Sequence, residues 1–226
     1  MSWSEVFKIN KNMKRALNEQ MRDIKYNPLT IITSSTTYKP PKTGLYKIIC
    51  VGKGGNSGGY NGGNANQAIA NSGGAGGVAI KTLRLSSATS YSITVSTTAS
   101  FSSELTATAG EDGANTISSS SIANGGTASG GDYNYEGGKG SNISITPTFG
   151  DTVKGGDTGV FISDLYHPMF YYDKTNNMIR YYGRGVLEYG GGAPAARWSG
   201  TGGNYAHLDA SGLPAAVIII PIEMEE

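Results

Sequence analysis

Aromatic side chains concentrate in one stretch of the chain, between residues 160 and 205, which holds ten of the 21 aromatic residues. A tyrosine ring offers a flat apolar face and a polar hydroxyl at low entropy cost, and arginine adds a planar hydrogen-bonding fork. Rings of this kind stack on the C–H faces of sugars, so the stretch predicts a binding surface. The candidate binding residues are Tyr166, His167, Tyr171, Tyr172, Arg180, Tyr181, Tyr182, Arg184 and Trp198.

The spacing of these aromatic residues predicts a β-hairpin. Residues 169–172 and 178–182 have the composition of two strands, and residues 173–177 have the composition of a five-residue loop. Successive side chains of a strand point to opposite faces, so one tyrosine of each adjacent pair is expected to face inward. About half of the candidates are therefore expected to be structural.

Residue types that carry catalysis, metal binding or phosphate binding occur without the required spacing. Ser57 stands where a dinucleotide motif beginning at Gly52 needs its third glycine, and no Walker motif is present. His167 and His207 are forty residues apart, with no cysteine pair, so no metal or other cofactor is predicted. Carboxylates that could serve a glycan hydrolase cannot be paired from the sequence. We assign no catalytic residue and predict that the chain is not an enzyme, with a surface polysaccharide depolymerase as an alternative. The available carboxylates are Glu111, Asp112, Asp151, Asp157, Asp164 and Glu188.

Overall composition points to an ordered but unusual protein. Of 226 residues 34 are glycine, 38% are hydrophobic and 15% are charged. Low charge argues against intrinsic disorder, which combines low hydrophobicity with high net charge. A formal net charge of +1 predicts neither nucleic acid nor an anionic membrane as a partner. The single cysteine, Cys50, lies in an apolar run and is expected to be a buried small hydrophobe.

The N-terminal region, residues 1–26, has the pattern of an amphipathic α-helix. Ser2 and Glu5 fit a capping box, and apolar residues then recur at spacings of three and four. We expect this helix to attach or oligomerise the protein; the alternative is a helix that lies on its own domain. The region lacks the apolar core of a secretory signal, so synthesis in a cytoplasm without membrane insertion is expected. The candidate attachment residues are Trp3, Val6, Met13, Leu17 and Ile24.

Residues 27–226 are predicted to form one β-structured domain, with residues 160–205 as a distal insertion. Short apolar or alternating runs separated by turns favour an antiparallel β-sandwich, so the predicted fold class is mainly β. The apolar run at 216–220 is expected to be a central strand, and Pro221 is expected to end its pairing. The predicted strands are residues 30–33, 44–51, 78–85, 91–95, 105–109, 142–145 and 216–220.

Glycine-rich tracts separate these strands, and residues 52–77 alone hold 11 glycines. One interpretation is a flexible linker. The other is that bare backbone packs on bare backbone, because only glycine permits so close an approach and extended segments then hydrogen-bond sideways. The repeated interruption of strands within one domain favours the second interpretation. Polyglycine-II-like segments inserted into the sandwich are therefore expected.

The order of these elements resembles a known family. "GLYKIICVGKGG", "GGAGGVAIKTLRLSSATSYSITVS", "ELTATAGEDGAN", "GGTASGGDYNYEGGKG" and "AAVIIIPIE" follow one another as in the glycine-rich domain of tail-fibre and receptor-binding proteins of phages, prophages and phage-tail-like bacteriocins. The resemblance covers about residues 30–158 and 185–223. "MSWSEVFKINKNMKRALNEQ" also looks like the start of prophage tail-fibre proteins of low-GC Gram-positive bacteria.

The resemblance implies a homotrimeric adhesin on a virion or phage-tail-like particle. Its distal loops would contact a bacterial cell-surface receptor, either a glycan or a surface-layer protein, and its N-terminal helix would contact tail or baseplate proteins. Residues 160–189 are more aromatic and less glycine-rich than the family's pattern, which favours a contact role for them. The alternative is a purely structural fibre or baseplate component without receptor binding.

Overall fold

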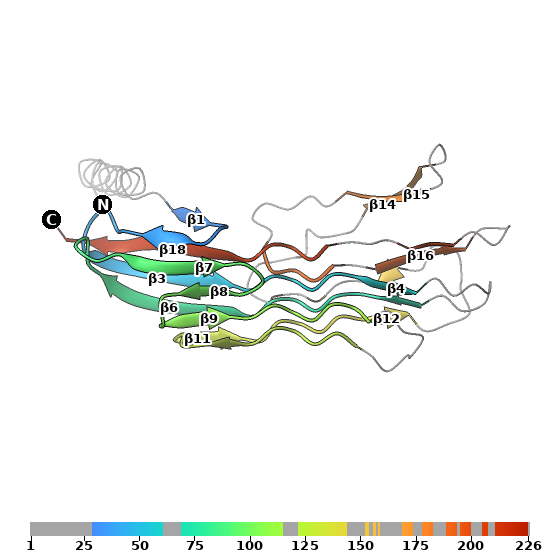
Figure 1. The fold of residues 1–226 in the computed structure, drawn as a ribbon, viewed down its shortest axis with the longest axis horizontal. Coiled ribbons are helices and arrows are strands. Elements are labelled where there is room, and N and C mark those ends of the chain that lie inside the picture. The colour runs from blue at the N-terminus through green and yellow to red at the C-terminus, as the bar shows by residue number, and fades with distance from the viewer. Residues whose placement is uncertain are drawn as a thin grey trace, which may run out of the picture.

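The computed structural model describes residues 29–60, 69–114, 122–143, 152–153, 156, 158, 169–173, 178–182, 189–193, 195–199, 205–207 and 211–225. These residues form strands and extended connections, with no helix among them (Figure 1). The predicted N-terminal helix lies outside the described residues. The strands are β1 Thr30–Ile32, β2 Thr36–Tyr38, β3 Gly44–Val51, β4 Gly58–Tyr60, β5 Ile69–Asn71, β6 Val78–Leu85, β7 Tyr91–Val95, β8 Ala99–Phe101, β9 Leu105–Ala107, β10 Ala128–Ser129, β11 Tyr133–Tyr135, β12 Asn142–Ile143, β13 Thr152–Val153, β14 Met169–Asp173, β15 Met178–Tyr182, β16 Ala195–Ser199, β17 Tyr205–His207 and β18 Ala216–Met224.

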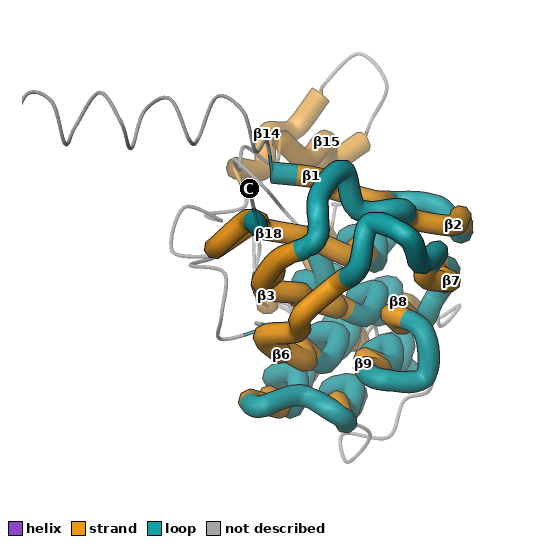
Figure 2. Tube along the Cα trace, turned by 90° about the vertical axis from the view of Figure 1, so that its left-hand side faces the viewer, coloured by secondary structure: helices purple, strands orange, loops and turns teal. Residues whose placement is uncertain are grey.

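Two five-stranded sheets form a sandwich at one end of the molecule. The first sheet has the order β1-β18-β3-β6-β11, and the second has the order β10-β9-β8-β7-β2. Figure 2 shows the two sheets side by side, seen close to end-on. The strand pairs within both sheets are antiparallel. The described residues are therefore mainly β and sandwich-like, in agreement with the coarse fold prediction.

The core lies between the inner faces of the two sheets. Tyr46 and Ile48 of β3 and Ile219 of β18 are fully buried there, opposite Phe101 and Leu105 of the second sheet. The ring of Phe101 stacks on Tyr91 with 5.4 Å between centroids. Apolar burial of this kind is the main favourable term in folding, so the sandwich supplies the stability on which the rest of the molecule depends.

The apolar and alternating runs form strands where the sequence predicts them. β3, β6 and β7 have the predicted bounds, and exposed residues alternate with buried or half-buried ones along β7 and the second half of β6. β18 is a central strand as predicted, because it pairs with both β1 and β3. The prediction that Pro221 ends the pairing of β18 is wrong. The ladder to β3 continues to Met224, with a register shift between Pro221 and Glu223 that accommodates the missing N–H of proline.

Glycine-rich stretches continue the strands along the long axis of the molecule (Figure 1). We call them the glycine segments, and all of them except residues 189–193 follow a strand of the sandwich or lead into one. Their connections reach two small three-stranded sheets, β12-β5-β4 and β13-β16-β17, the labelled strands of which lie at the far end of the long axis. The glycine segments are residues 52–57, 72–77, 108–114, 122–127, 136–141, 189–193 and 211–215.

The segment at residues 72–77, here the central segment, donates its backbone hydrogen bonds to three neighbours in strict rotation. Six consecutive amides bond in turn to residues 136–141, 189–193 and 108–114, and the same order then repeats, with N···O distances of 2.7–3.0 Å. This order requires about three residues per turn. The pairs are Ser72 to Ser141, Gly73 to Ala193, Gly74 to Glu111, Ala75 to Gly138, Gly76 to Gly190 and Gly77 to Thr108.

The positions of the glycines follow from the same threefold geometry. A Cβ on Gly73 or Gly76 would lie 2.1 or 2.0 Å from a carbonyl oxygen of residues 52–57. A Cβ on Gly74 or Gly77 would lie 2.1 or 2.2 Å from a carbonyl oxygen of residues 122–127. Side chains are carried only at every third residue, Ser72, Ala75 and Val78, all of which are buried. Backbone therefore packs on backbone on two of the three sides of this segment.

Candidate functional site

The predicted aromatic hairpin is present in the backbone. β14 and β15 pair antiparallel, with Phe170 opposite Tyr181 and Tyr171 opposite Arg180. Asp173 pairs with Met178, so the connecting loop is one residue shorter than predicted. Figure 1 places the hairpin toward the end of the long axis opposite the C-terminus. Five candidate residues are thereby brought together, namely Tyr171, Tyr172, Arg180, Tyr181 and Tyr182.

The register divides the hairpin positions between two faces. Tyr171 and Arg180 share one face, because directly paired residues of an antiparallel ladder lie on the same side. Tyr172 and Tyr181 fall on the opposite face by the period of two along each strand. The two positions of each adjacent tyrosine pair therefore fall on different faces of the ladder.

The other candidates are distributed elsewhere. Trp198 lies on β16, in the sheet β13-β16-β17, and is paired with Ala206 rather than with the hairpin. Tyr166, His167 and Arg184 lie outside the described residues. The attachment candidates Trp3, Val6, Met13, Leu17 and Ile24 lie outside them as well. The structure thus groups five of the nine predicted binding residues in one hairpin and separates Trp198 from them.

Two further tyrosines are exposed at a place where the sequence indicated only a glycine tract. Tyr133 is 63% exposed and Tyr135 is 43% exposed, on β11 at the edge of the first sheet. They pair with Ile80 and Val78, so both positions lie on the outer face of this sheet. The alternation Tyr-Asn-Tyr after a Gly-Gly-Asp turn is the signal that could have identified this strand.

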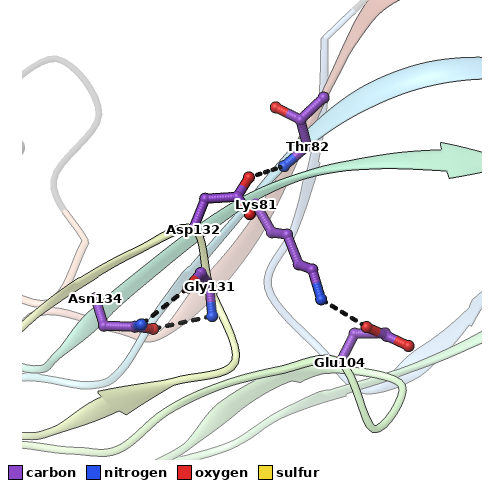
Figure 3. A network of polar contacts seen from close by, with 6 residues as sticks. All are labelled: Lys81, Thr82, Glu104, Gly131, Asp132 and Asn134. Carbon is purple, nitrogen blue, oxygen red and sulfur yellow. Dashed lines mark hydrogen bonds and ion pairs between the residues drawn. The ribbon is translucent and has the colours of Figure 1, made fainter.

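A network of polar contacts holds the turn before β11 (Figure 3). The amide of Gly131 donates to the side chain of Asn134 at 3.0 Å, and the Asn134 side chain donates back to the Gly131 carbonyl at 3.0 Å. Asp132 accepts from the backbone amide of Thr82 at 3.0 Å. Gly130 has a φ of +81°, a conformation that glycine adopts without steric cost.

A salt bridge joins the two sheets close to this turn. The Lys81 ammonium lies 2.8 Å from Glu104, which belongs to the turn between β8 and β9 (Figure 3). Both side chains are partly exposed, so the pair stabilises the fold by at most about 1 kcal/mol. It links β6 of the first sheet to the turn between β8 and β9 of the second sheet.

The two described carboxylates among the hydrolase candidates hold glycine segments together. Glu111 accepts from the backbone amide and the side-chain amide of Asn124 at 2.9 and 3.0 Å. Asp112 accepts from the backbone amide of Asn56 at 2.6 Å. Asp151, Asp157, Asp164 and Glu188 lie outside the described residues. Each described carboxylate thus accepts hydrogen bonds from a neighbouring glycine segment.

Cys50 is buried in the sandwich core and free of any disulfide, as the sequence indicates. Burial raises the pKa of its thiol from 9.0 to about 12, and a backbone hydrogen bond at Phe101 offsets only part of that effect. The thiol is therefore protonated at neutral pH. Within the described residues, His, Cys, Asp and Glu side chains form no group of three or more that could hold a metal ion.

Comparison with known proteins places the chain in a family. A family model for a glycine-rich domain matches residues 30–215, which is more than half of the 226-residue chain. The chain belongs to this glycine-rich domain family. The match begins at β1 and ends at the residue before β18, so it covers all the glycine segments and every strand of the sandwich except β18. No curated protein matches the chain. The described residues of this family member include no helix with the length and hydropathy needed to span a membrane.

Proposed function

We propose that this glycine-rich protein is a tail-fibre or receptor-binding protein of a phage or phage-tail-like particle. In this proposal the N-terminal helix contacts tail or baseplate proteins, and the aromatic hairpin binds the surface of a host bacterium. The observation that carries the proposal is the threefold rotation of hydrogen bonds around the central segment. A rod of this construction suits a protein that must present a contact surface away from its point of attachment.

Polyglycine II is the conformation that we propose for the glycine segments. Three residues per turn, no hydrogen bonds within a segment and bonds to several neighbours are its expected features. Each ordered glycine costs more conformational entropy than any other residue. That cost favours a role in which stiffness and small cross-section matter, because an ordinary β-sheet would hold the strands together at lower entropic cost.

The hairpin is the proposed contact element. Tyrosine and arginine are residues that dominate binding energy in protein interfaces, and tyrosine stacks on sugar rings. Its place toward the end of the long axis opposite the C-terminus supports a contact role (Figure 1). The proposed receptor is a surface glycan or a surface-layer protein. A homotrimer is the proposed assembly.

A deletion tests the contact role directly. A variant in which residues 168–182 are replaced by a short Gly-Ser linker should keep the fold of the sandwich and lose adsorption to the bacterial cells that the parent protein binds. Sedimentation velocity and circular dichroism report assembly and folding, and a pull-down with intact cells reports adsorption. A correctly folded deletion variant that adsorbs as well as the parent would exclude the hairpin as the contact element.

A matched control separates contact from folding. Ile122 is 47% exposed and lies far in sequence from the hairpin. The variant Ile122→Ala is expected to adsorb like the parent, because it changes an exposed apolar side chain outside the proposed contact element. If the parent protein itself does not bind the cells while remaining folded, the purely structural fibre or baseplate role replaces the receptor-binding role.

A further inference from the structure

The edge strand β11 carries two exposed aromatic rings at a fixed spacing. Tyr133 and Tyr135 are two residues apart on one face, which separates their Cα atoms by about 7 Å. They are the most exposed tyrosines among the described residues with described side chains. Adjacent on the same face are Ile80, which is half-buried, and Val78, which is buried. The two rings thus lie next to apolar residues of β6, on the edge strand of the sheet.

The strand is held in place before any ligand arrives. The reciprocal Asn134–Gly131 hydrogen bonds and the Asp132–Thr82 hydrogen bond pin the turn that leads into it (Figure 3). The side-chain amide of Asn134 is hydrogen-bonded within the turn. The rings of Tyr133 and Tyr135 are therefore the exposed groups of β11 that remain available to a ligand. A rigid pair of rings loses little conformational entropy on binding.

Acidic residues flank the two tyrosines in the sequence. Asp132 precedes Tyr133, Glu136 follows Tyr135, and residues 132–136 are all exposed. Ionised carboxylates on either side of the rings disfavour an anionic ligand by charge repulsion. Flat apolar rings next to negative charge match the C–H face of a neutral sugar.

The same charges argue against a second copy of this chain as the occupant. An antiparallel pairing of β11 with another β11, centred on Asn134, would place Asp132 opposite Glu136 of the second copy at both ends. Like charges directly opposite each other destabilise a strand pair. Charged residues beside an exposed edge strand are a known means of preventing such pairing. The edge is therefore protected from self-association while its rings stay exposed.

From these observations we propose that Tyr133 and Tyr135 form a binding site for a neutral glycan on the side of the sandwich. The C–H faces of the sugar stack on the two rings. This site is separate in sequence and sheet from the aromatic hairpin and does not rest on the proposed host-attachment function. A single stacking site of this size has millimolar affinity unless several copies act together.

Titration of the isotopically labelled full-length chain by NMR tests the site. The probes are cellotetraose and chitotetraose, which are neutral, and tetragalacturonate, which is anionic. The proposal predicts amide shift changes concentrated at residues 132–136 with at least one neutral probe, and weaker changes with the anionic probe. An absence of changes at these residues with both neutral probes overturns it, as does tighter binding of a tetralysine peptide than of either sugar.

Matched variants identify the stacking rings. The double variant Y133A/Y135A is expected to weaken neutral-sugar binding by about tenfold or more, because two stacked rings are removed. The double variant Y133F/Y135F keeps both rings and is expected to bind within about twofold of the parent. Ile122→Ala, which changes an exposed apolar residue on another segment, is expected to bind like the parent. Equal loss in the phenylalanine and alanine variants contradicts stacking.

This test is independent of adsorption to host cells. The hairpin deletion keeps β11, so it should still bind the neutral probe even where it no longer adsorbs to bacteria. Loss of probe binding in the hairpin deletion, with its fold intact, would assign the sugar site to the hairpin instead of β11. Loss of probe binding in Y133A/Y135A with normal adsorption would support two separate binding surfaces.

Discussion

At the scale of single residues, the buried thiol of Cys50 makes the stability of the fold depend on alkaline pH. Burial raises the pKa of this thiol in the folded protein to about 12 from its ordinary 9.0. Burial also raises the pKa of Tyr46, whose hydroxyl donates to the Lys42 carbonyl at 2.7 Å. Both groups prefer the protonated form in the folded state. Their contribution is fully present below the unfolded pKa and is lost as pH rises toward the folded pKa.

We therefore expect the free energy of unfolding to fall between pH 9 and pH 12, the range bounded by the two pKa values of Cys50. The thiol contributes a slope of about 1.4 kcal/mol per pH unit in that range. The variant Cys50→Ala should show a slope that is smaller by this amount, as measured by urea unfolding at a series of pH values. If the unfolding free energies of the parent and the variant depend on pH in the same way, the thiol of Cys50 is not the group responsible.

Adjacent residues of the central segment differ sharply in the side chain that they tolerate. A Cβ on Gly76 would lie 2.0 Å from the carbonyl oxygen of Gly52, a backbone atom that cannot move aside alone. Gly76→Ala should therefore destabilise the protein by about 3 kcal/mol or more. Ala75→Gly, at the neighbouring and fully buried position, should cost only about 1 to 2 kcal/mol. Urea unfolding measures the free energy of unfolding of both variants. Similar losses of stability in the two would refute backbone-on-backbone packing.

Ser102 is strained in the turn between β8 and β9. Its φ is 49°, in the left-handed region that disfavours residues with a Cβ. Ser102→Gly removes this strain but increases the entropy of the unfolded chain, so the net gain should be up to about 1 kcal/mol. Thermal unfolding should show a higher midpoint for this variant. A lower midpoint would mean that the serine side chain stabilises the turn.

At the scale of elements, strand β18 ties the first sheet together. It pairs with β1 on one side and β3 on the other, and its residue Ile219 is fully buried whereas Ile222 is 54% exposed. Ile219→Ala should cost about 2 to 5 kcal/mol, because it removes core packing and leaves a cavity. Ile222→Ala should change stability by less than about 0.5 kcal/mol. Comparable losses in urea unfolding would contradict the inward direction of Ile219.

The predictability of each strand depended on what its residues must bury. β3, β6 and β7 carry apolar or alternating patterns, so their bounds follow from the sequence. β4 and β5 contain glycine, alanine and asparagine beside a single larger residue, so no periodicity marks them. Their pairing is set by the glycine segments that they continue. Pro221 was misjudged because a bulge in β18 carries the ladder past the missing amide.

The two candidate sites also differed in how far the sequence could predict them. The hairpin β14–β15 was predictable because two aromatic runs flank a polar loop of strand-compatible length. Tyr133 and Tyr135 were missed because they lie inside a glycine tract, where the composition of the surrounding residues conceals a three-residue strand. Their exposure depends on the sheet order, which places β11 at an edge, and no local pattern specifies that order.

At the scale of the whole molecule, two kinds of packing follow one another along the long axis (Figure 1). The sandwich buries apolar side chains between two sheets, whereas the glycine segments bury backbone against backbone. The chain passes repeatedly from one to the other, because strands β3, β6, β9, β11 and β18 each adjoin a glycine segment. We therefore expect the glycine segments to unfold together with the core in one cooperative transition. A flexible linker of similar composition would not do so.

Native-state hydrogen exchange of the amides of residues 72–77 tests this central claim most directly. These amides donate to three different neighbouring segments, so none can open without disrupting the array. The account predicts that they exchange as slowly as the amides of the core strands β3 and β18, through global unfolding. Rapid exchange of residues 72–77 beside a protected sandwich would show that the glycine segments are independent, loosely held chains and would contradict the account.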